Sequence, residues 1–120
     1  MKKVFILLFV LGVSLPSFAG LKEKHVIGTW SYKVETDQET LTGTMKFAKE
    51  DGKLTGKIFS DEGESLSMSN VEIKDNDVLY FEITPDYNVL KISLTIDGKK
   101  YEGTVDLGDM QVPITGEKIE

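Results

Sequence analysis

From residue 28 onward, apolar and polar residues alternate with a period of two, and short clusters of turn residues interrupt the alternation at near-regular intervals. This pattern is typical of half-buried β-strands, because successive side chains of a strand point to opposite faces of the sheet. The pairs Asp51-Gly52 and Asp97-Gly98 supply the positive φ that two-residue hairpin turns require. The sequence therefore predicts an antiparallel meander of eight strands, at residues 28–35, 40–50, 53–60, 64–74, 77–84, 89–96, 99–107 and 110–118.

The predicted sheet has one apolar face, and the chain offers no convincing helix to cover it. The sheet must therefore close on itself or fold into a sandwich. Glycines at inward positions favour closure, because positions without a side chain let strongly coiled strands bend. These glycines are Gly43, Gly56, Gly103 and Gly116. We predict an all-β fold, an eight-stranded antiparallel up-and-down meander closed into a small barrel, with a half-open barrel or a sandwich as the alternative.

The fourth predicted strand changes face along its length. Leu66 and Met68 occupy even positions and share one face of the strand, whereas Val71 and Ile73 occupy odd positions and would lie on the other face. One extra residue in a strand restores such a change of face, so we predict a β-bulge near Ser69-Asn70.

The start of the chain has the pattern of a secretory signal peptide. Two lysines precede an apolar run at residues 4–13, and Ser17 and Ala19 are the small residues of a cleavage site. This run is about half of the roughly 20 residues that cross a bilayer core, so we expect cleavage rather than an anchor and no stable membrane insertion afterwards. The expected parts are a signal peptide at residues 1–19, a lead-in segment at 20–27 and the barrel at 28–118. We expect a soluble exported protein, periplasmic or secreted.

Composition argues against several classes of function. The 120 residues suffice for one domain, and the net charge of -6 with no arginine argues against a nucleic-acid partner. Cleavage would leave 12 lysines against 20 acidic residues, a net charge of -8. The absence of cysteine excludes thiolate catalysis and Cys-type zinc sites. His25, the single histidine, lies in the lead-in segment with no recognisable nucleophile motif, so we expect no enzyme activity, no catalytic residues, no cofactor and no metal.

Several short motifs carry a family resemblance. Ile27-Gly28-Thr29-Trp30 opens the first strand, and similar Gly-containing pieces recur at residues 54–57, 101–105 and 114–118. These motifs resemble a small lipocalin-like (calycin-like) β-barrel family of exported bacterial proteins, in which Gly-x-Trp opens the barrel. The resemblance covers residues 27–118; it implies an eight-stranded barrel and suggests a small apolar ligand. Lipocalins proper carry a C-terminal helix and an arginine across the barrel base, and this chain has no arginine and no room for that helix.

Successive turns of an up-and-down meander alternate between the two ends of the barrel. The turns at residues 51–52, 75–76 and 97–98 are tight, so we predict a pinched end that Trp30 plugs. The turns at the other end are longer on average and acidic, so we predict an open mouth that favours a neutral or cationic molecule over an anion. The residues expected to bind a ligand at this mouth are Val34, Leu41, Ile58, Leu66, Ile83, Tyr87, Leu90, Leu107 and Met110.

Two functions from different classes follow. The first is a non-catalytic binding module that holds a small neutral or cationic apolar molecule at the mouth. A cavity of ~300 Å³ or more would favour this function. The second is a protein-interaction or inhibitor-type module with a fully packed core, and the size and apolar character of the inward residues favour such a core. Val78, Tyr80 and Val89 point outward, where they form either a small apolar patch for a protein partner or ordinary cross-strand packing.

Overall fold

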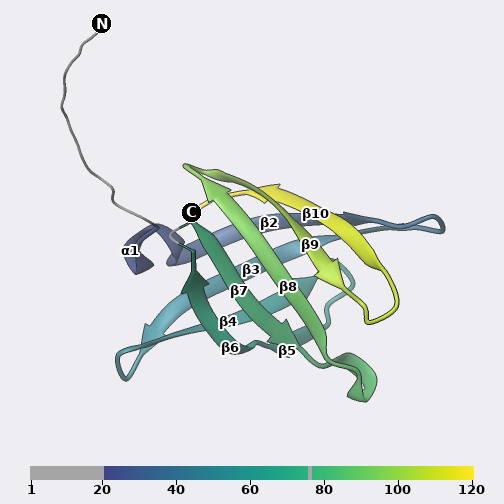
Figure 1. Cartoon of the computed structure of the whole chain (residues 1–120), viewed down its shortest axis with the longest axis horizontal. Coiled ribbons are helices and arrows are strands. Elements are labelled where there is room, and N and C mark those ends of the chain that lie inside the picture. The colour runs from purple at the N-terminus through teal and green to yellow at the C-terminus, as the bar shows by residue number, and fades with distance from the viewer. Residues whose placement is uncertain (1–20, 76) are drawn as a thin grey trace, which may run out of the picture.

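The computed structural model describes residues 21–75 and 77–120, so the predicted signal peptide and Gly20 lie outside the described residues. A short helix precedes a single nine-stranded antiparallel sheet (Figure 1). Within the described ranges, no helix is long and apolar enough to cross a membrane. The elements are α1 (Glu23–Val26), β2 (Gly28–Glu35), β3 (Thr40–Glu50), β4 (Lys53–Ser60), β5 (Ser65–Ser67), β6 (Ser69–Lys74), β7 (Val78–Ile83), the 3-10 turn η2 (Pro85–Tyr87), β8 (Leu90–Asp97), β9 (Lys100–Asp106) and β10 (Gln111–Glu117).

The sheet closes into a barrel because its first and last long strands pair with each other. The strand order is β5-β4-β3-β2-β10-β9-β8-β7-β6, with β10 antiparallel to β2. Every other neighbour in this order follows its partner directly along the chain, as in an up-and-down meander. The predicted all-β barrel is therefore confirmed, and the bounds of β2, β3 and β4 are those expected from the alternation.

The structure has nine strands rather than the predicted eight, because the fourth predicted strand is divided. Its first part, β5, pairs with β4, and its second part, β6, pairs with β7. The pairing of β6 shifts register between Ser69 and Glu72, and Asn70 has a φ of 52°. This irregularity confirms the predicted β-bulge. It turns apolar residues on both sides of the break toward the core, and the barrel closes through this divided strand.

Inward glycines lie opposite large side chains of the neighbouring strand. The register pairs Tyr32 with Gly43, Phe47 with Gly56, Leu94 with Gly103 and Tyr101 with Gly116. A Cβ atom at Gly43, Gly103 or Gly116 would lie 2.0 Å from a backbone oxygen of an adjacent strand. Only glycine fits at these points, since real Cβ atoms keep well beyond that distance. The glycines thus let the strands bend sharply, as the sequence predicted.

The seam between β2 and β10 depends on side chains as well as on the backbone. Ladder pairs are formed by Ile114 with Val34 and by Thr115 with Lys33, and an isolated bridge joins Trp30 to Lys118. Between them, the Glu117 amide donates to Ser31 Oγ at 3.0 Å. The Tyr101 hydroxyl donates to the Ser31 carbonyl at 2.7 Å, over the position of Gly116.

The end of the barrel that carries α1 is closed by packing. Trp30 is 1% exposed, its indole nitrogen donates to the Val26 carbonyl at 2.9 Å, and its ring meets Tyr101 edge to face at 5.9 Å. Val26 is fully buried. The prediction that Trp30 plugs the pinched end is confirmed, and the lead-in segment takes part in this packing. Its apolar side chains cover the end of the core, and α1 lies beside the chain terminus after β10 (Figure 1).

The glycine beneath Tyr101 gives a direct test of this packing. The variant Gly116→Ala should lose about 1–3 kcal/mol of unfolding free energy, the scale of overpacking in a filled site, because its methyl group meets the Ser31 carbonyl and the Tyr101 hydroxyl. The neighbouring variant Thr115→Ala, at an exposed position of the same strand, should lose less than about 1 kcal/mol. Urea unfolding followed by Trp30 fluorescence measures both. Equal losses would show that the close approach at Gly116 is relaxed at little cost.

Candidate functional site

A cavity of about 260 Å³ opens at the end of the barrel opposite α1. Its wall is mainly apolar, and the large buried side chains Trp30, Phe47 and Phe81 fill the other half of the barrel. Seven of the nine residues predicted to line the mouth line this cavity: Val34, Leu41, Ile58, Leu66, Ile83, Leu90 and Leu107. The interior is therefore neither the fully packed core that the sequence favoured nor an empty cup.

Two of the predicted residues do not line the cavity. Tyr87 is 98% exposed in η2, and Met110 is 52% exposed in the turn before β10. Both lie in connections rather than in strands, so strand parity does not set where their side chains point. In contrast, the deeper wall residues Ile92, Val105, Val112 and Ile114 were not among those predicted to line the mouth. The alternation in the sequence places these four side chains on the inward face. It does not indicate how far along the barrel the core is packed, and so it did not place them in the cavity wall.

Tyr32 is the polar residue deepest in the wall of the cavity. Its side chain lies over Gly43, and the residue is 8% exposed. No hydrogen bond joins its hydroxyl to another side chain or to the backbone within the described part of the chain. Burial raises the pKa of Tyr32 above its usual value, and the nearby carboxylate of Asp61 raises it further. The hydroxyl therefore stays protonated and available to donate a hydrogen bond.

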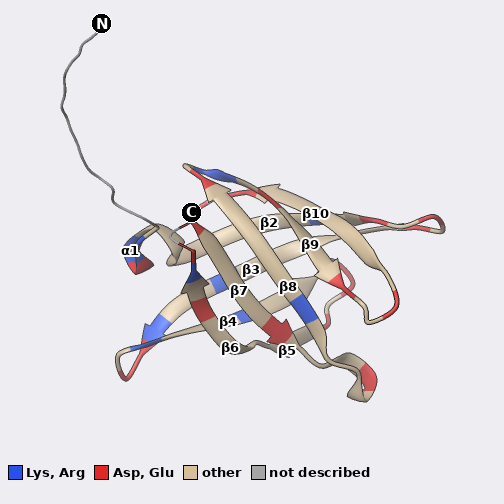
Figure 2. Ribbon diagram, in the orientation of Figure 1, with Lys and Arg blue, Asp and Glu red and all other residues tan. Residues whose placement is uncertain are grey.

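The mouth is ringed by acidic turns whose backbone is ordered by local hydrogen bonds. Ser60 Oγ accepts from the amides of Glu62 and Glu64 at 3.2 Å each, and Thr42 donates to the Asp61 carboxylate at 2.5 Å. Glu64 lines the cavity itself, together with the hydroxyl-bearing residues Thr36, Ser60 and Ser65. Figure 2 shows acidic residues at the tips of the connections at this end. The cavity is therefore apolar inside and negatively charged at its entrance.

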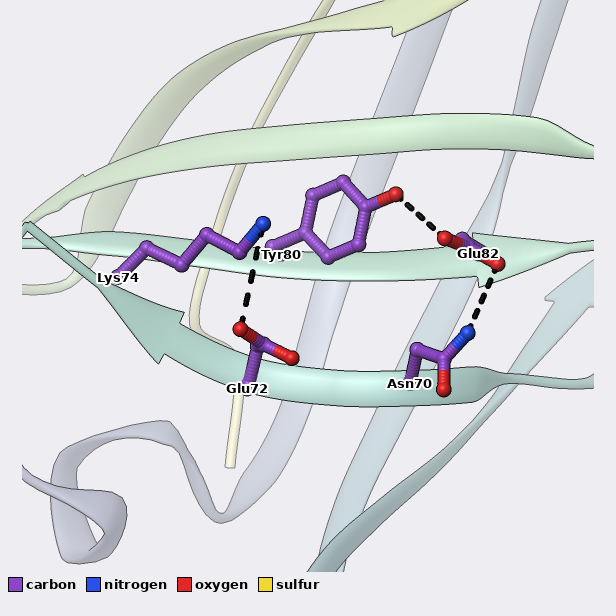
Figure 3. Close-up of polar contacts among 5 residues, drawn as sticks. All are labelled: Asn70, Glu72, Lys74, Tyr80 and Glu82. Atoms are coloured by element: carbon purple, nitrogen blue, oxygen red, sulfur yellow. Dashed lines mark hydrogen bonds and ion pairs between the residues drawn. The ribbon is translucent and has the colours of Figure 1, made fainter.

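The outward residue Tyr80 belongs to a polar cluster rather than to an apolar patch (Figure 3). Its hydroxyl donates to the Glu82 carboxylate at 2.5 Å, and the Asn70 amide donates to the other oxygen at 3.0 Å. Lys74 lies over the tyrosine ring, 4.0 Å from its centre, and pairs with Glu72 at 3.9 Å. These contacts join β6 to β7 beside the bulge, so the cross-strand packing that the sequence offered as one alternative is the one observed.

The hydrogen bond between Tyr80 and Glu82 shifts both groups. It is the main cause that raises the pKa of Tyr80 to about 12, with partial burial and the neighbouring carboxylates adding to the effect. The same bond, followed by the one from Asn70, lowers the pKa of Glu82. Both shifts are explained by this pair on the outer wall, away from the cavity, so they support no acid–base role for the site.

A larger but more open groove of about 770 Å³ lies over the β2–β10 seam on the outer wall. Charged and hydroxyl side chains such as Lys33, Lys100 and Glu102 line much of it. Since ligand sites in proteins are mostly enclosed and apolar, the cavity at the mouth is the better candidate despite its smaller volume.

Within residues 21–75 and 77–120, no three His, Asp or Glu side chains gather in a way that could hold a metal ion. His25 lies in α1 at the closed end, where its backbone carbonyl accepts from Lys118 at 3.2 Å. It is therefore remote from the cavity.

Comparison with known proteins shows the fold and no family. No protein-family model matches the chain, and no curated protein matches it. A solved structure of a redesigned β-barrel superposes with a TM-score of 0.66 and 20% sequence identity, covering 82% of this chain and 95% of the other. At this identity the likeness supports the β-barrel architecture alone, and the resemblance to lipocalin-like proteins stays a prediction.

The Tyr80–Glu82 pair predicts a titration that can be checked. Replacing Glu82 by Gln should move the pKa of Tyr80 from about 12 back toward its usual value of 10.0, because the carboxylate no longer holds the phenol proton. Glu72→Gln should cause a smaller fall, since Glu72 acts on the phenol only through its charge. Ultraviolet absorbance titration, with Tyr80→Phe to assign the signal, measures both. Equal falls in the two variants would contradict the hydrogen bond as the main cause.

The same shift has a stability consequence of defined sign. Because the pKa of Tyr80 is higher in the folded protein than in the unfolded chain, its contribution is complete below pH 10 and is lost as the pH rises toward 12. The unfolding free energy should therefore fall more steeply over this range in the wild-type protein than in Tyr80→Phe.

Proposed function

We propose that this protein is a non-catalytic binding module that holds a small apolar molecule in the cavity at the mouth of its barrel. The observation that carries the proposal is the mainly apolar wall, to which eight strands and the adjoining turns contribute. The volume of about 260 Å³ lies just below the ~300 Å³ at the lower end of typical ligand pockets, so the ligand is small. This is the kind of ligand that the lipocalin-like resemblance suggested.

Electrostatics selects the charge of the ligand. Glu64 lies in the wall near the entrance, and Asp61 and Glu62 flank it on the same turn. A ring of carboxylates raises the local concentration of cations and repels anions. We therefore infer that the ligand is neutral or cationic, and that fatty acids and other carboxylates bind poorly.

Tyr32 adds a directional contact inside the cavity. Tyr32 lines the cavity, and its hydroxyl donates to no described protein group, so it is free to donate a hydrogen bond to a ligand. We therefore infer a ligand with an acceptor, such as an ether, a carbonyl or a ring nitrogen. No pair of acid and base faces the cavity, since Tyr32 and Glu64 are its titratable residues, so binding without turnover is the proposed activity.

The proposed place of action is outside the cytoplasm. The positive start, the apolar run and the small residues before Gly20 support export. An exported carrier or scavenger of a small apolar molecule is consistent with a domain that holds no cofactor-dependent motif.

A pair of variants tests the cavity. Leu41 is 43% exposed at the entrance, so Leu41→Trp should block the cavity without disturbing the core and lower the affinity for the neutral dye N-phenylnaphthylamine at least about tenfold. Met110→Trp adds the same side chain to an exposed position outside the cavity and should change the affinity less than about twofold. Dye fluorescence measures both. No saturable binding by the wild-type protein, or equal losses in the two variants, would refute the proposal.

A second pair tests the charge preference. At low ionic strength, Glu64→Gln should lower the affinity for the cationic dye proflavin about two- to fivefold, the range of an exposed ion pair, and leave the neutral dye unaffected. Glu62→Gln, which removes a charge of the same turn outside the cavity wall, is the matched control and should have a smaller effect. Anilinonaphthalene sulfonate, the anionic counterpart of the neutral dye, should bind more weakly than it. Stronger binding of this anion would contradict the inferred preference.

A further inference from the structure

The open end carries exposed apolar side chains that the cavity does not use. Among the described residues, seven large hydrophobic residues are exposed, and five of them lie at this end: Leu41, Tyr87, Val89, Leu107 and Met110. Tyr87, Val89 and Met110 do not line the cavity. A molecule small enough to occupy about 260 Å³ cannot also cover these three side chains. Their exposure therefore fits a second, larger partner.

The connections at this end also have a single sign of charge. Residues 36–39, 61–64, 84–89 and 107–110 contain seven acidic residues and no lysine. At the closed end, by contrast, α1 and the turn between β8 and β9 mix lysines with acids (Figure 2). Clustered carboxylates repel one another when a partner excludes water from them, unless that partner supplies cations. The charge therefore specifies a basic partner.

The backbone of η2 holds Tyr87 outward at a conformational cost. Tyr87 has a φ of 71°, in the left-handed region that few residues other than glycine, asparagine and aspartate adopt. Pro85 restrains the turn, and the Asn88 amide donates to the Pro85 carbonyl at 3.0 Å. Strained backbone of this kind tends to occur at functional sites. The turn thus exposes the side chain of Tyr87 almost completely, at 98%, next to the carboxylate of Asp86.

We propose that the open end is a docking surface for a partner protein that presents lysine or arginine side chains around an apolar residue. Tyr87 is the aromatic anchor, since tyrosine is among the residues enriched at the energetically important positions of protein interfaces. Asp86 and Asp109 lie beside the exposed residues Tyr87 and Met110 and pair with the cations of the partner. Docking there covers the entrance of the cavity, so the partner is placed to control the exchange of the small molecule.

The same features argue against two other occupants. A second copy of this chain would bring a second set of carboxylates to the surface, and like charges in one interface are repulsive. A membrane with anionic lipids would repel the acidic turns in the same way. Both are outcomes of the test below.

The test uses a synthetic peptide of lysine and leucine with one tryptophan, and a matched peptide with glutamate in place of lysine. The lysine peptide should bind and shift amide NMR signals of residues 36–39, 61–64, 84–89 and 107–110, and the glutamate peptide should not bind. Tyr87→Ala should lower the peptide affinity about tenfold, as expected for an interface anchor. Ile119→Ala, which removes an exposed apolar side chain at the closed end, should leave it unchanged.

A matched charge control separates docking from general attraction to an acidic protein. The double variant Asp86→Asn/Asp109→Asn should lower the peptide affinity at low salt several-fold more than Asp51→Asn/Asp97→Asn, which removes the same charge from turns at the closed end. Equal effects, or NMR shifts spread over the barrel wall, would overturn the proposal. So would self-association in sedimentation, or binding to anionic lipid vesicles that Tyr87→Ala abolishes. Tyr87→Ala should not alter binding of N-phenylnaphthylamine, so this proposal and that of the ligand cavity fail separately.

Discussion

The barrel depends on a repeated steric arrangement, in which a glycine of one strand lies under a large side chain of the next. A closed sheet of this size bends its strands strongly, and at such bends the adjacent backbone comes too close for any Cβ atom. The space left by Gly116 and Gly43 is filled by the side chains of Tyr101 and Tyr32. Each pair of a glycine and a tyrosine therefore lets the strand bend and also fills the space that the bend leaves. At the seam the same tyrosine also satisfies the Ser31 carbonyl, which the gap in the ladder would leave without a partner.

The order of side-chain sizes along the strands explains why the barrel is packed at one end and hollow at the other. The bulkiest inward side chains, Trp30, Phe47 and Phe81, lie in the half nearer α1, and Phe47 meets Phe81 edge to face at 5.7 Å. Toward the mouth the inward residues are mainly valine, leucine and isoleucine. A barrel of about eight strands is just wide enough for its own side chains to fill, so smaller inward residues leave space. The cavity is thus a consequence of the order of side-chain sizes along the strands.

Much of the fold could be predicted because period-2 alternation and Asp-Gly turns are local signals. The bounds of the first three strands, the bulge near Asn70 and the burial of Trp30 all follow from parity and turn chemistry. The division into β5 and β6 could not be predicted, since it depends on which neighbour each half pairs with across the barrel. The role of α1 was missed for a related reason. Four helical residues are too few for a periodic pattern. The segment is held in place by the hydrogen bond from the Trp30 indole to the Val26 carbonyl, a contact set by the tertiary structure.

The candidate site was predictable in part, and the limits are physical. Strand parity identified the apolar wall, whereas the placement of Tyr87 and Met110 depends on loop conformation, which alternation does not encode. The two ends also differ in what they contribute. The packed end supplies the buried area that stabilises the barrel, so the open end is free to carry features that cost stability, such as left-handed backbone at Tyr87 and exposed apolar side chains. Features that cost stability at one end of an otherwise regular barrel are best explained by binding at that end.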